Sequence, residues 1–288
     1  MGWHQLLIIW YRSCHACRPR INCISRICIY LEKVQTILDQ VKSEQIVCVS
    51  IVSHGHGSMA FDLAKQILAC PEVSQLILTL NIPENFPELV DERLLLIRNE
   101  FSKGFGENHN SAFDVCNSPY FCVVNPDIEL IDNPFSKMVE ISNKENVGIV
   151  APLVINSDGN LEDSMRIFLT PWTLIKRLIK IKEKPRKFNP NLGYFTPDWV
   201  AGMFMLFRSD NYMKLGGFDE RFKLYCEDAD ICIRSRKMGL QIAVCPSSRV
   251  VHIAQRKSHK NIVYLLWHIR SLSRYFKKHL FYFPKDYI

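Results

Sequence analysis

IVCVSIVS, residues 46–53, is a continuous apolar run with the length of one β-strand. A strand that is apolar on both faces is typical of a parallel sheet covered by helices on both sides. The Gly-containing segment 54–58 follows it, and 59–70 has the spacing of an amphipathic helix. The pattern therefore predicts a strand, a turn and a helix.

The same alternation continues along the chain. Further strands are predicted at 76–80, 94–98, 120–124, 149–155, 199–207, 241–245 and 249–253, and helices are predicted to end at 112–116 and to span 225–238. Strands that alternate with helices imply βαβ units and a mainly parallel α/β sheet. In such sheets ligands bind at the carboxyl ends of the strands.

Composition excludes disordered and collagen-like classes, because 48% hydrophobic and 23% charged residues in 288 are ordinary for a globular protein. The net charge of +7 is unevenly placed. Basic residues crowd into 176–187 and 256–285, whereas acids cluster near 219–230. This asymmetry suggests an acidic cleft beside a basic face suited to phosphate or an anionic membrane.

The 11 cysteines are scattered without a pairing rhythm, which favours a reducing, cytoplasmic compartment. No apolar run reaches the ~18–20 residues that span a bilayer, so neither a secreted nor an integral membrane protein is expected. Residues 1–45 differ from the rest and are predicted to form a loosely docked extension. A zinc knuckle is the competing interpretation there, although two clean C-x2-C pairs are missing from Cys14, Cys17, Cys23 and Cys28.

Asn125, Pro126 and Asp127 directly follow the apolar run 120–124. A carboxylate on the loop that leaves a buried strand is well placed to hold Mg²⁺ or Mn²⁺ together with the phosphates of a substrate. Asn-Pro-Asp is also good turn chemistry, so a plain turn is the alternative interpretation.

Three acids gather at Glu227, Asp228 and Asp230, near the start of the predicted helix 225–238, where the helix dipole favours negative charge. Arg234 is spaced to pair with Asp230 on one helix face. Helix capping would explain one or two of these acids. A carboxylate without a cationic partner is what a general base requires, so the group is a candidate catalytic centre.

Two further features are weaker in isolation. His252 follows an apolar run, where a core or surface histidine is the usual interpretation. The segment 99–110 contains Lys103, which can reach a phosphate, and Gly104, which allows close backbone approach.

In this order the features resemble the family 2 glycosyltransferases of the GT-A fold, and within them the rhamnosyltransferase-like group of bacterial polysaccharide assembly. The resemblance covers about 46–279, and its motifs are specific as an ordered set. It rests on VSIVSH (49–54), KGFGENHN (103–110), VNPD (124–127), WVAGMFML (199–206), GGFDE (216–220), EDAD (227–230) with Arg234, and VH (251–252).

The resemblance implies a Rossmann-like mixed sheet and an inverting, metal-dependent transfer. It implies that Asp127 occupies the metal-binding place of the D-x-D motif, whose first Asp is here Asn125, and that His252 is the second ligand of Mg²⁺ or Mn²⁺. Asp228 matches the general base, with Glu227 and Asp230 as supporting groups.

The nucleotide side of the site is also implied by the resemblance. The residues expected to contact a dTDP- or UDP-sugar are Ser53, His54, Asn81, Lys103, Gly104, Asn125 and Arg234. Two positions depart from the family pattern. Leu80-Asn81 stands where the family usually has Asp-Asn, which bears on recognition of the nucleoside, and Lys223 stands where an aromatic residue is common, which bears on the acceptor side.

Three parts are predicted: the extension 1–45, a glycosyltransferase domain 46–256 and a basic amphipathic helix 257–288. The domain is expected to divide into a nucleotide-binding half, 46–130, and an acceptor and catalytic half, 131–256. The helix either packs on the domain or lies in a membrane interface. The latter suits a peripheral enzyme at the inner face of the cell membrane that acts on a saccharide or polyprenyl-diphosphate-linked acceptor; no nucleic-acid partner is expected.

Two other functions compete with this interpretation. A nucleotidyltransferase would also use an α/β sheet, a metal and a nucleoside phosphate, but residues 53–58 lack the Lys or Arg of its usual phosphate loop. A catalytically silent sugar-nucleotide-binding or scaffold protein is the alternative outside enzymes, favoured by the Leu80 departure and the unusual N-terminus.

Overall fold

The computed structural model describes residues 45–179, 188–189, 193–253 and 262–279. The predicted extension 1–45 with its four knuckle cysteines lies outside this range except for its last residue, as do parts of both basic stretches. The described cysteines are all free thiols.

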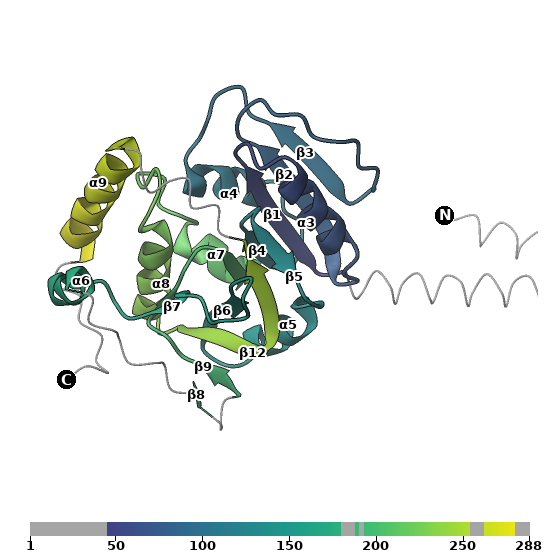
Figure 1. Cartoon of the computed structure of the whole chain (residues 1–288). Helices are drawn as coiled ribbons and strands as arrows, with labels where there is room; N and C mark the ends of the chain where they lie inside the picture. The colour runs from purple at the N-terminus through teal and green to yellow at the C-terminus, as the bar shows by residue number, and fades with distance from the viewer. Residues whose placement is uncertain (1–44, 180–187, 190–192, 254–261, 280–288) are drawn as a thin grey trace, which may run out of the picture. The chain divides into compact units, whose positions relative to one another are not determined.

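Apolar strands build a mixed sheet whose first half is parallel (Figure 1). β1 (Val47–Ser53) lies between β2 (Val73–Leu80) and β4 (Tyr120–Val124), and β2 continues to β3 (Leu94–Arg98), all in parallel. β11 (Phe204–Arg208) runs antiparallel between β4 and β6 (Val147–Ile155). β12 (Gln241–His252) is parallel to β6 and antiparallel to β5 (Ile128–Leu130). This arrangement confirms the predicted mixed α/β sheet.

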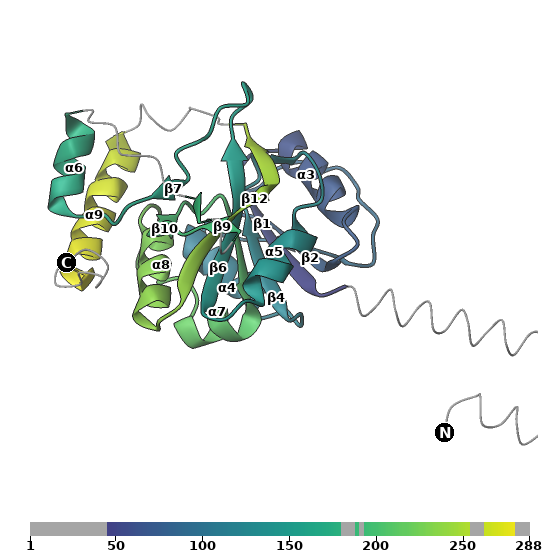
Figure 2. The same cartoon turned by 90° about the horizontal axis from the view of Figure 1, so that it is seen from below.

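Helices cover both faces of this sheet (Figure 2). Residues of α3 (Ser58–Leu68) and α5 (Phe135–Ser142) join one buried cluster, and residues of α4 (Phe105–Phe113), α7 (Ser209–Leu215) and α8 (Glu227–Lys237) join the other. β1 supplies both, with Val47, Val49 and Ile51 on the first face and Cys48 on the second. A strand buried on both faces has to be apolar throughout, which explains the opening run.

Two helices lie side by side beyond α8, namely α6 (Pro171–Leu178) and α9 (Ile262–His279), as Figures 1 and 2 both show. Tyr275 of α9 is buried in the second cluster, where Leu272 and Phe276 pack against it. The hydroxyl of Ser271 donates to the carbonyl of Leu224 at 2.8 Å. The C-terminal helix therefore packs on the domain through one face. Within the described residues, no helix is long and apolar enough to cross a membrane.

The structure differs from the predicted elements at two places that matter for the site. The strand predicted at 199–207 is interrupted between β10 (Trp199–Val200) and β11, which frees the backbone of 201–203 for other contacts. The two strands predicted at 241–245 and 249–253 form the single strand β12, because a register shift between Cys245 and Arg249 accommodates Pro246 without ending the pairing with β6.

Short elements escaped prediction. β5, α5, α6, α7 and the two-residue strands β7 (Met165–Arg166), β8 (Phe188–Asn189) and β9 (Tyr194–Phe195) were absent from the sequence pattern. Elements of this length contain too few turns or alternations for a period to be recognised. β5 and β7 nevertheless position the site described next.

Candidate active site

Asp127 and His252 meet at the end of the sheet, although they are far apart in the sequence. The antiparallel pairing of β12 with β5 sets His252 opposite Ile128 and thus beside the loop that follows β4. The His252 Nε2 atom lies 3.2 Å from Asp127 Oδ2, and the Ile253 N–H donates to the Asp127 carbonyl at 2.8 Å. The hydrogen bond to Asp127 raises the pKa of His252 above its ordinary value, although burial opposes it.

Two atoms of this pair are available to coordinate a metal ion. Asp127 Oδ1 and His252 Nδ1 are buried and have no hydrogen-bond partner among the described residues. Glu162 Oε1 is the nearest further acid, 3.9 Å from His252 Nδ1. Buried polar atoms are normally paired, so an unpaired carboxylate oxygen in this position fits a divalent cation. In the described part of the chain no three His, Cys, Asp or Glu side chains gather as a metal site, so the remaining ligands would come from substrate and water.

Asp228 lies in the first turn of α8, where its carboxylate accepts hydrogen bonds from two backbone amides. Its Oδ2 accepts from the Gly202 N–H at 3.0 Å, and its Oδ1 accepts from the Ala229 N–H at 2.8 Å. The chain enters α8 through Tyr225 and Cys226, whose φ angles of 72° and 69° lie in the left-handed region. Non-glycine residues adopt this conformation only under local strain, which commonly occurs at functional sites.

Glu227 and Asp228 titrate as a pair, and the environment separates their roles. Burial, and then the charge of Asp228, raises the pKa of Glu227 to about 8. Burial also raises the pKa of Asp228, while the charge of Arg166 opposes that rise. Near neutral pH Glu227 therefore keeps its proton, which leaves Asp228 as the candidate proton acceptor of the two. A carboxylate whose pKa lies above its usual range is a better proton acceptor.

The interrupted strand joins Asp228 to the loop of Asp127. Gly202 binds the Asp228 carboxylate, and the next residue, Met203, accepts a hydrogen bond from the Asn125 N–H at 2.8 Å. Consecutive residues thus contact the two loops that carry the candidate base and the candidate metal ligand. Gly202 lies within the WVAGMFML motif, but its hydrogen bond to the base was not predicted from it.

The segment 162–166 makes a second connection between the same two centres. Glu162 approaches His252, and the charge of Arg166 acts on Asp228. Between them, the Ser164 carbonyl accepts from the Ala201 N–H at 2.9 Å, beside Gly202. Neither Glu162 nor Arg166 was predicted, because no recognisable motif surrounds them and only the tertiary fold brings them to the site.

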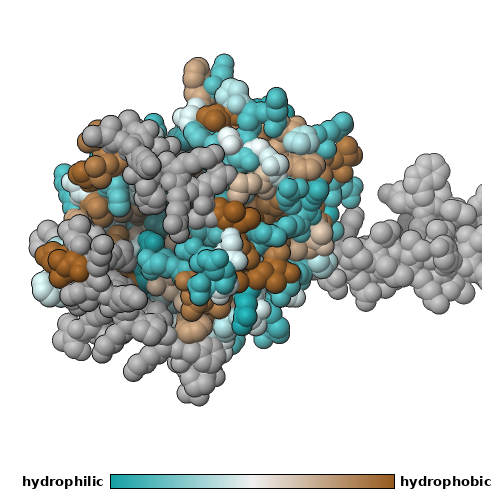
Figure 3. Space-filling view, viewed as in Figure 1, coloured by the Kyte–Doolittle hydropathy of each residue, from teal (hydrophilic) through white to brown (hydrophobic). Residues whose placement is uncertain are grey.

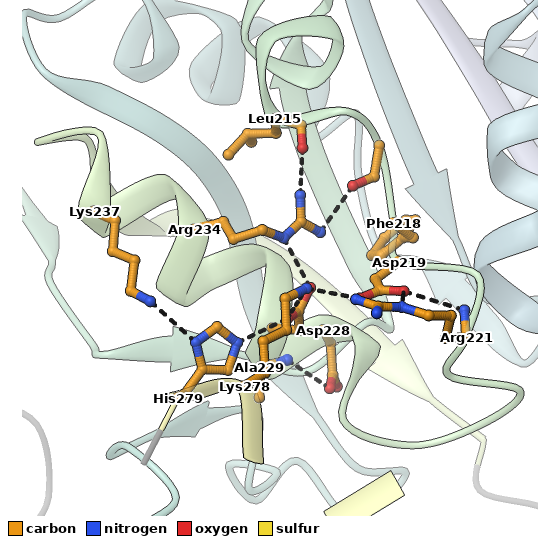
Figure 4. A network of polar contacts seen from close by, with 12 residues as sticks. Leu215, Phe218, Asp219, Arg221, Asp228, Ala229, Arg234, Lys237, Lys278 and His279 are labelled. Atoms are coloured by element: carbon orange, nitrogen blue, oxygen red, sulfur yellow. Dashed lines mark hydrogen bonds and ion pairs between the residues drawn. The ribbon is translucent and has the colours of Figure 1, made fainter. Parts of the chain in front are cut away.

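Asp230 and Arg234 occupy a different environment. Asp230 is fully buried, and its carboxylate accepts from Arg234 Nε at 2.8 Å, His279 Nε2 at 2.7 Å and Lys278 Nζ at 2.7 Å. Arg234 also donates to the carbonyls of Leu215 and Gly217 (Figure 4). Because these contacts join α8 to α9 and to the turn after α7, we expect a structural role for both residues in place of the supporting and ligand-binding roles suggested by the sequence.

Four of the predicted nucleotide-side residues gather at the carboxyl ends of β1 and β2, namely Ser53, His54, Asn81 and Lys103. Ser53 ends β1, where its hydroxyl accepts from the His56 N–H at 3.3 Å. Asn81 follows β2, where its Nδ2 lies 3.2 Å from His54 Nδ1 and its Oδ1 accepts from the Lys103 N–H at 2.8 Å. Asn81 thus ties the loop after β1 to the loop before α4. This is the edge where α/β sheets bind ligands.

A hollow of about 460 Å³ opens beside these residues. It is lined by Leu80, Ile82, Pro83, Glu84, Asn85, Arg98 and Asn99, at the ends of β2 and β3. Glu84 was not predicted; its carboxylate accepts from the N–H groups of Gly57 at 3.0 Å and Gly55 at 3.2 Å and fastens the glycine turn before α3. Gly104 packs against the backbone of Lys223, where a Cβ would lie 3.2 Å from the Lys223 carbonyl oxygen.

The glycosyl transferase family 2 model matches residues 78–211. Rhamnosyltransferase WbbL of Escherichia coli K12 is 25% identical over 80% of this chain and 92% of its own length. An N-acetylglucosaminyl-diphospho-decaprenol L-rhamnosyltransferase of Mycobacterium tuberculosis is 24% identical over 51% of this chain and 51% of its own length. This chain therefore spans about half the length of that relative.

Solved structures agree on the fold. The crystal structure of GalNAc-T7 with UDP, GalNAc and Mn²⁺ matches 75% of this chain and 44% of its own with a TM-score of 0.57 at 17% identity. The mannosyltransferase PcManGT of Pyrobaculum calidifontis, in complex with GDP-Man and Mn²⁺, matches 81% of this chain and 64% of its own with a TM-score of 0.53 at 11% identity. These comparisons confirm the sequence-based resemblance: the chain is a glycosyltransferase with a family 2 domain and the GT-A fold, similar to the rhamnosyltransferases of that family.

Proposed function

We propose that this protein is an inverting glycosyltransferase that moves a sugar from a nucleotide diphosphate donor to a hydroxyl of a saccharide acceptor in cell-surface polysaccharide synthesis. Rhamnose from a dTDP- or UDP-linked donor is the leading candidate, because rhamnosyltransferases recur among the relatives. The acceptor is proposed to be lipid-linked, since the mycobacterial relative is named for a diphospho-decaprenol substrate.

The observation that supports this reaction most strongly is the Asp228 carboxyl group, which Gly202 binds and which the next residue, Met203, links to the loop of Asp127. Gly202 and Ala229 orient the Asp228 carboxylate, and no cationic side chain in the described part of the chain is bonded to it. In the proposed step Asp228 accepts the proton of the acceptor hydroxyl as that oxygen attacks the anomeric carbon, and the nucleoside diphosphate leaves from the opposite face. One displacement inverts the configuration and requires no protein nucleophile.

Asp127 and His252 are the residues proposed to hold Mg²⁺ or Mn²⁺. The buried unpaired Oδ1 of Asp127 and the imidazole of His252 provide oxygen and nitrogen donors suited to such an ion. A divalent cation there would neutralise the diphosphate of the leaving group. Binding of Mn²⁺, followed by electron paramagnetic resonance with a nucleoside diphosphate present, should weaken in Asp127→Asn and in His252→Ala. Unchanged binding in both variants would reject this metal site.

Exposed apolar side chains support a peripheral membrane contact. Trp172, Ile175 and Ile179 at α6 are 62%, 46% and 60% exposed, and Leu265, Leu266 and Ile269 of α9 are 55%, 59% and 56% exposed. Hydrophobic surface appears over both helices at the left edge of Figure 3. Exposed apolar side chains that gather on two neighbouring helices are a candidate interaction site. Flotation with liposomes that contain anionic lipid should recover the chain, whereas Leu266→Asp/Ile269→Asp should remain in the dense fraction; equal recovery rejects the membrane contact.

A donor panel tests the reaction itself. Release of nucleoside diphosphate is measured for dTDP- and UDP-sugars with a saccharide acceptor, and Asp228→Asn should lower turnover by about 10²–10⁴-fold, the usual contribution of a general base. Asp62→Asn, which removes an exposed carboxylate of α3, is the matched control. Near wild-type turnover in Asp228→Asn would exclude Asp228 as the general base. If no donor gave release of nucleoside diphosphate, the proposed transferase activity would be rejected.

A further inference from the structure

A basic pocket lies between α9 and the segment 221–223. Its volume is about 220 Å³, and it is lined by Arg221, Lys223, Trp267, Arg270, Ser271 and Arg274. Four of these six side chains are cationic and none is acidic. Such a concentration of positive charge around one small hollow favours the binding of an anion.

The neighbouring acid leaves most of this charge uncompensated. Asp219 pairs with Arg221 at 2.6 Å and with Lys278 at 2.7 Å. Hydrogen bonds from Arg221 and Lys278 hold the pKa of Asp219 far below its usual range, although burial acts to raise it. Arg274 donates to the carbonyl of Arg221, a neutral group. Arg270 makes no hydrogen bond or ion pair to any residue in the described part of the chain. The pocket therefore keeps at least the charges of Arg270, Arg274 and Lys223 for a ligand.

The pocket is organised by packing. Lys223 Nζ lies over the indole of Trp267, 4.8 Å from the ring centroid, and Arg274 lies 5.9 Å from the ring centroid of Phe222. Ser271 fixes this part of α9 to the Leu224 carbonyl. Cations held over aromatic faces lose less conformational entropy when an anion binds than fully solvated ones do.

A chain of contacts links the pocket to the candidate base. The Phe105 N–H donates to the Lys223 carbonyl at 3.2 Å, and the Phe105 ring comes within 3.3 Å of the Cβ position of Gly202, the residue that binds Asp228. On α9 itself, the ring of His268 lies 4.8 Å from that of Tyr225, just before α8. Burial lowers the pKa of His268, and the charges of Arg166 and Asp228 also act on it. An anion in the pocket would thus belong to a molecule that reaches Asp228 from the α9 side.

We propose that this pocket binds the diphosphate of a lipid-linked acceptor, an inference that rests on the proposed function. Guanidinium and ammonium groups bind phosphate oxygens with charge-assisted hydrogen bonds. The saccharide would extend towards Asp228, and the lipid would extend along the exposed Leu265, Leu266 and Ile269 on the adjacent face of α9. The pocket thereby selects acceptors that carry a diphosphate and positions their first sugars at the base.

The test measures binding of farnesyl diphosphate to the full chain by titration calorimetry. Arg270→Gln and Lys223→Gln should each raise the Kd about tenfold, as expected for one charge-assisted contact. Lys214→Gln, which removes an exposed cation on α7, should leave the Kd unchanged. Equal Kd values for the wild type, Arg270→Gln and Lys223→Gln, or an equal loss in Lys214→Gln, would overturn the proposal.

Further arms separate the possible sources of the anion. Farnesyl diphosphate should bind more tightly than farnesyl monophosphate, inorganic pyrophosphate or farnesol, because only it offers both the diphosphate and the lipid. Tighter binding of inorganic pyrophosphate would indicate a free-phosphate site and reject the acceptor assignment. A nucleoside diphosphate should not displace farnesyl diphosphate, and displacement would assign the pocket to the donor. These binding results do not depend on turnover, so failure of sugar transfer with intact diphosphate binding would reject the proposed function alone.

Discussion

Replacing Asp230 by Asn should detach α9 from α8 and destabilise the fold without acting on the chemistry. Asp230 is fully buried and receives hydrogen bonds from Arg234, Lys278 and His279. Asn has nearly the same shape but no charge, and its amide group would face donors. The substitution therefore removes the buried negative charge that these three donors share but leaves the donors in place, which is the costly way to alter a buried ion pair.

The expected magnitude follows from what each partner retains. Breaking a buried ion pair costs about 3–5 kcal/mol. Arg234 keeps the carbonyls of Leu215 and Gly217, and Lys278 keeps Asp219, so the lower end of that range, about 3 kcal/mol, is expected here. With a urea m-value of about 2–3 kcal/mol/M for a chain of this size, the unfolding midpoint should fall by about 1–1.5 M.

Urea unfolding followed by circular dichroism measures the midpoint, and hydrogen exchange of the α9 amides locates the change. Exchange in α9 should accelerate before exchange in β1, because the substitution releases that helix first. Glu140→Gln is the control, since it removes one partner of an exposed pair with Lys137 and should change the free energy of unfolding by about 0–1 kcal/mol. An unchanged midpoint together with a large loss of turnover would refute the structural role and restore Asp230 to the catalytic group.

Three further predictions concern buried groups. Burial raises the pKa of Glu227 from 4.5 to about 8, so its contribution to stability is fully present below pH 4.5 and is lost as the pH rises through 8. Between these values the free energy of unfolding should fall by up to about 1.4 kcal/mol per pH unit, and Glu227→Gln should remove that dependence in urea unfolding measured at each pH. Burial lowers the pKa of His109 from 6.5 to about 3, so the folded state binds fewer protons than the unfolded state, and stability is lost as the pH falls from 6.5 towards 3. His109→Gln should remove that acid dependence of the free energy of unfolding. The same slope of free energy against pH in this variant would contradict the prediction. Gly148→Ala should cost about 1–3 kcal/mol because its Cβ would lie 2.3 Å from Ser235 Oγ and 2.8 Å from Leu240 Cβ. Adding Ser235→Ala should recover part of the loss in denaturant unfolding, since that hydroxyl is buried and has no hydrogen-bond partner among the described residues.

Local pattern was sufficient for the long elements and for the chemistry of two loops. The apolar run of β1 predicted a strand buried on both faces, and the acids after β4 and at the start of α8 were recognised from residue type and position alone. The family and the fold followed from the order of these motifs. Such features depend on neighbouring residues, whose spacing fixes which face of a strand or helix they occupy.

Only the tertiary structure distinguished neighbouring acids of the same chemistry. Asp228 and Asp230 look alike in the sequence, but Gly202 binds the first and His279 of α9 binds the second. The pairing of β12 with β5 brought His252 to Asp127, and the docking of α9 created the basic pocket beside Lys223. These outcomes depend on which distant segments pack together, and the hydrophobic and hydrogen-bond energies that decide such packing act between residues that no local period connects.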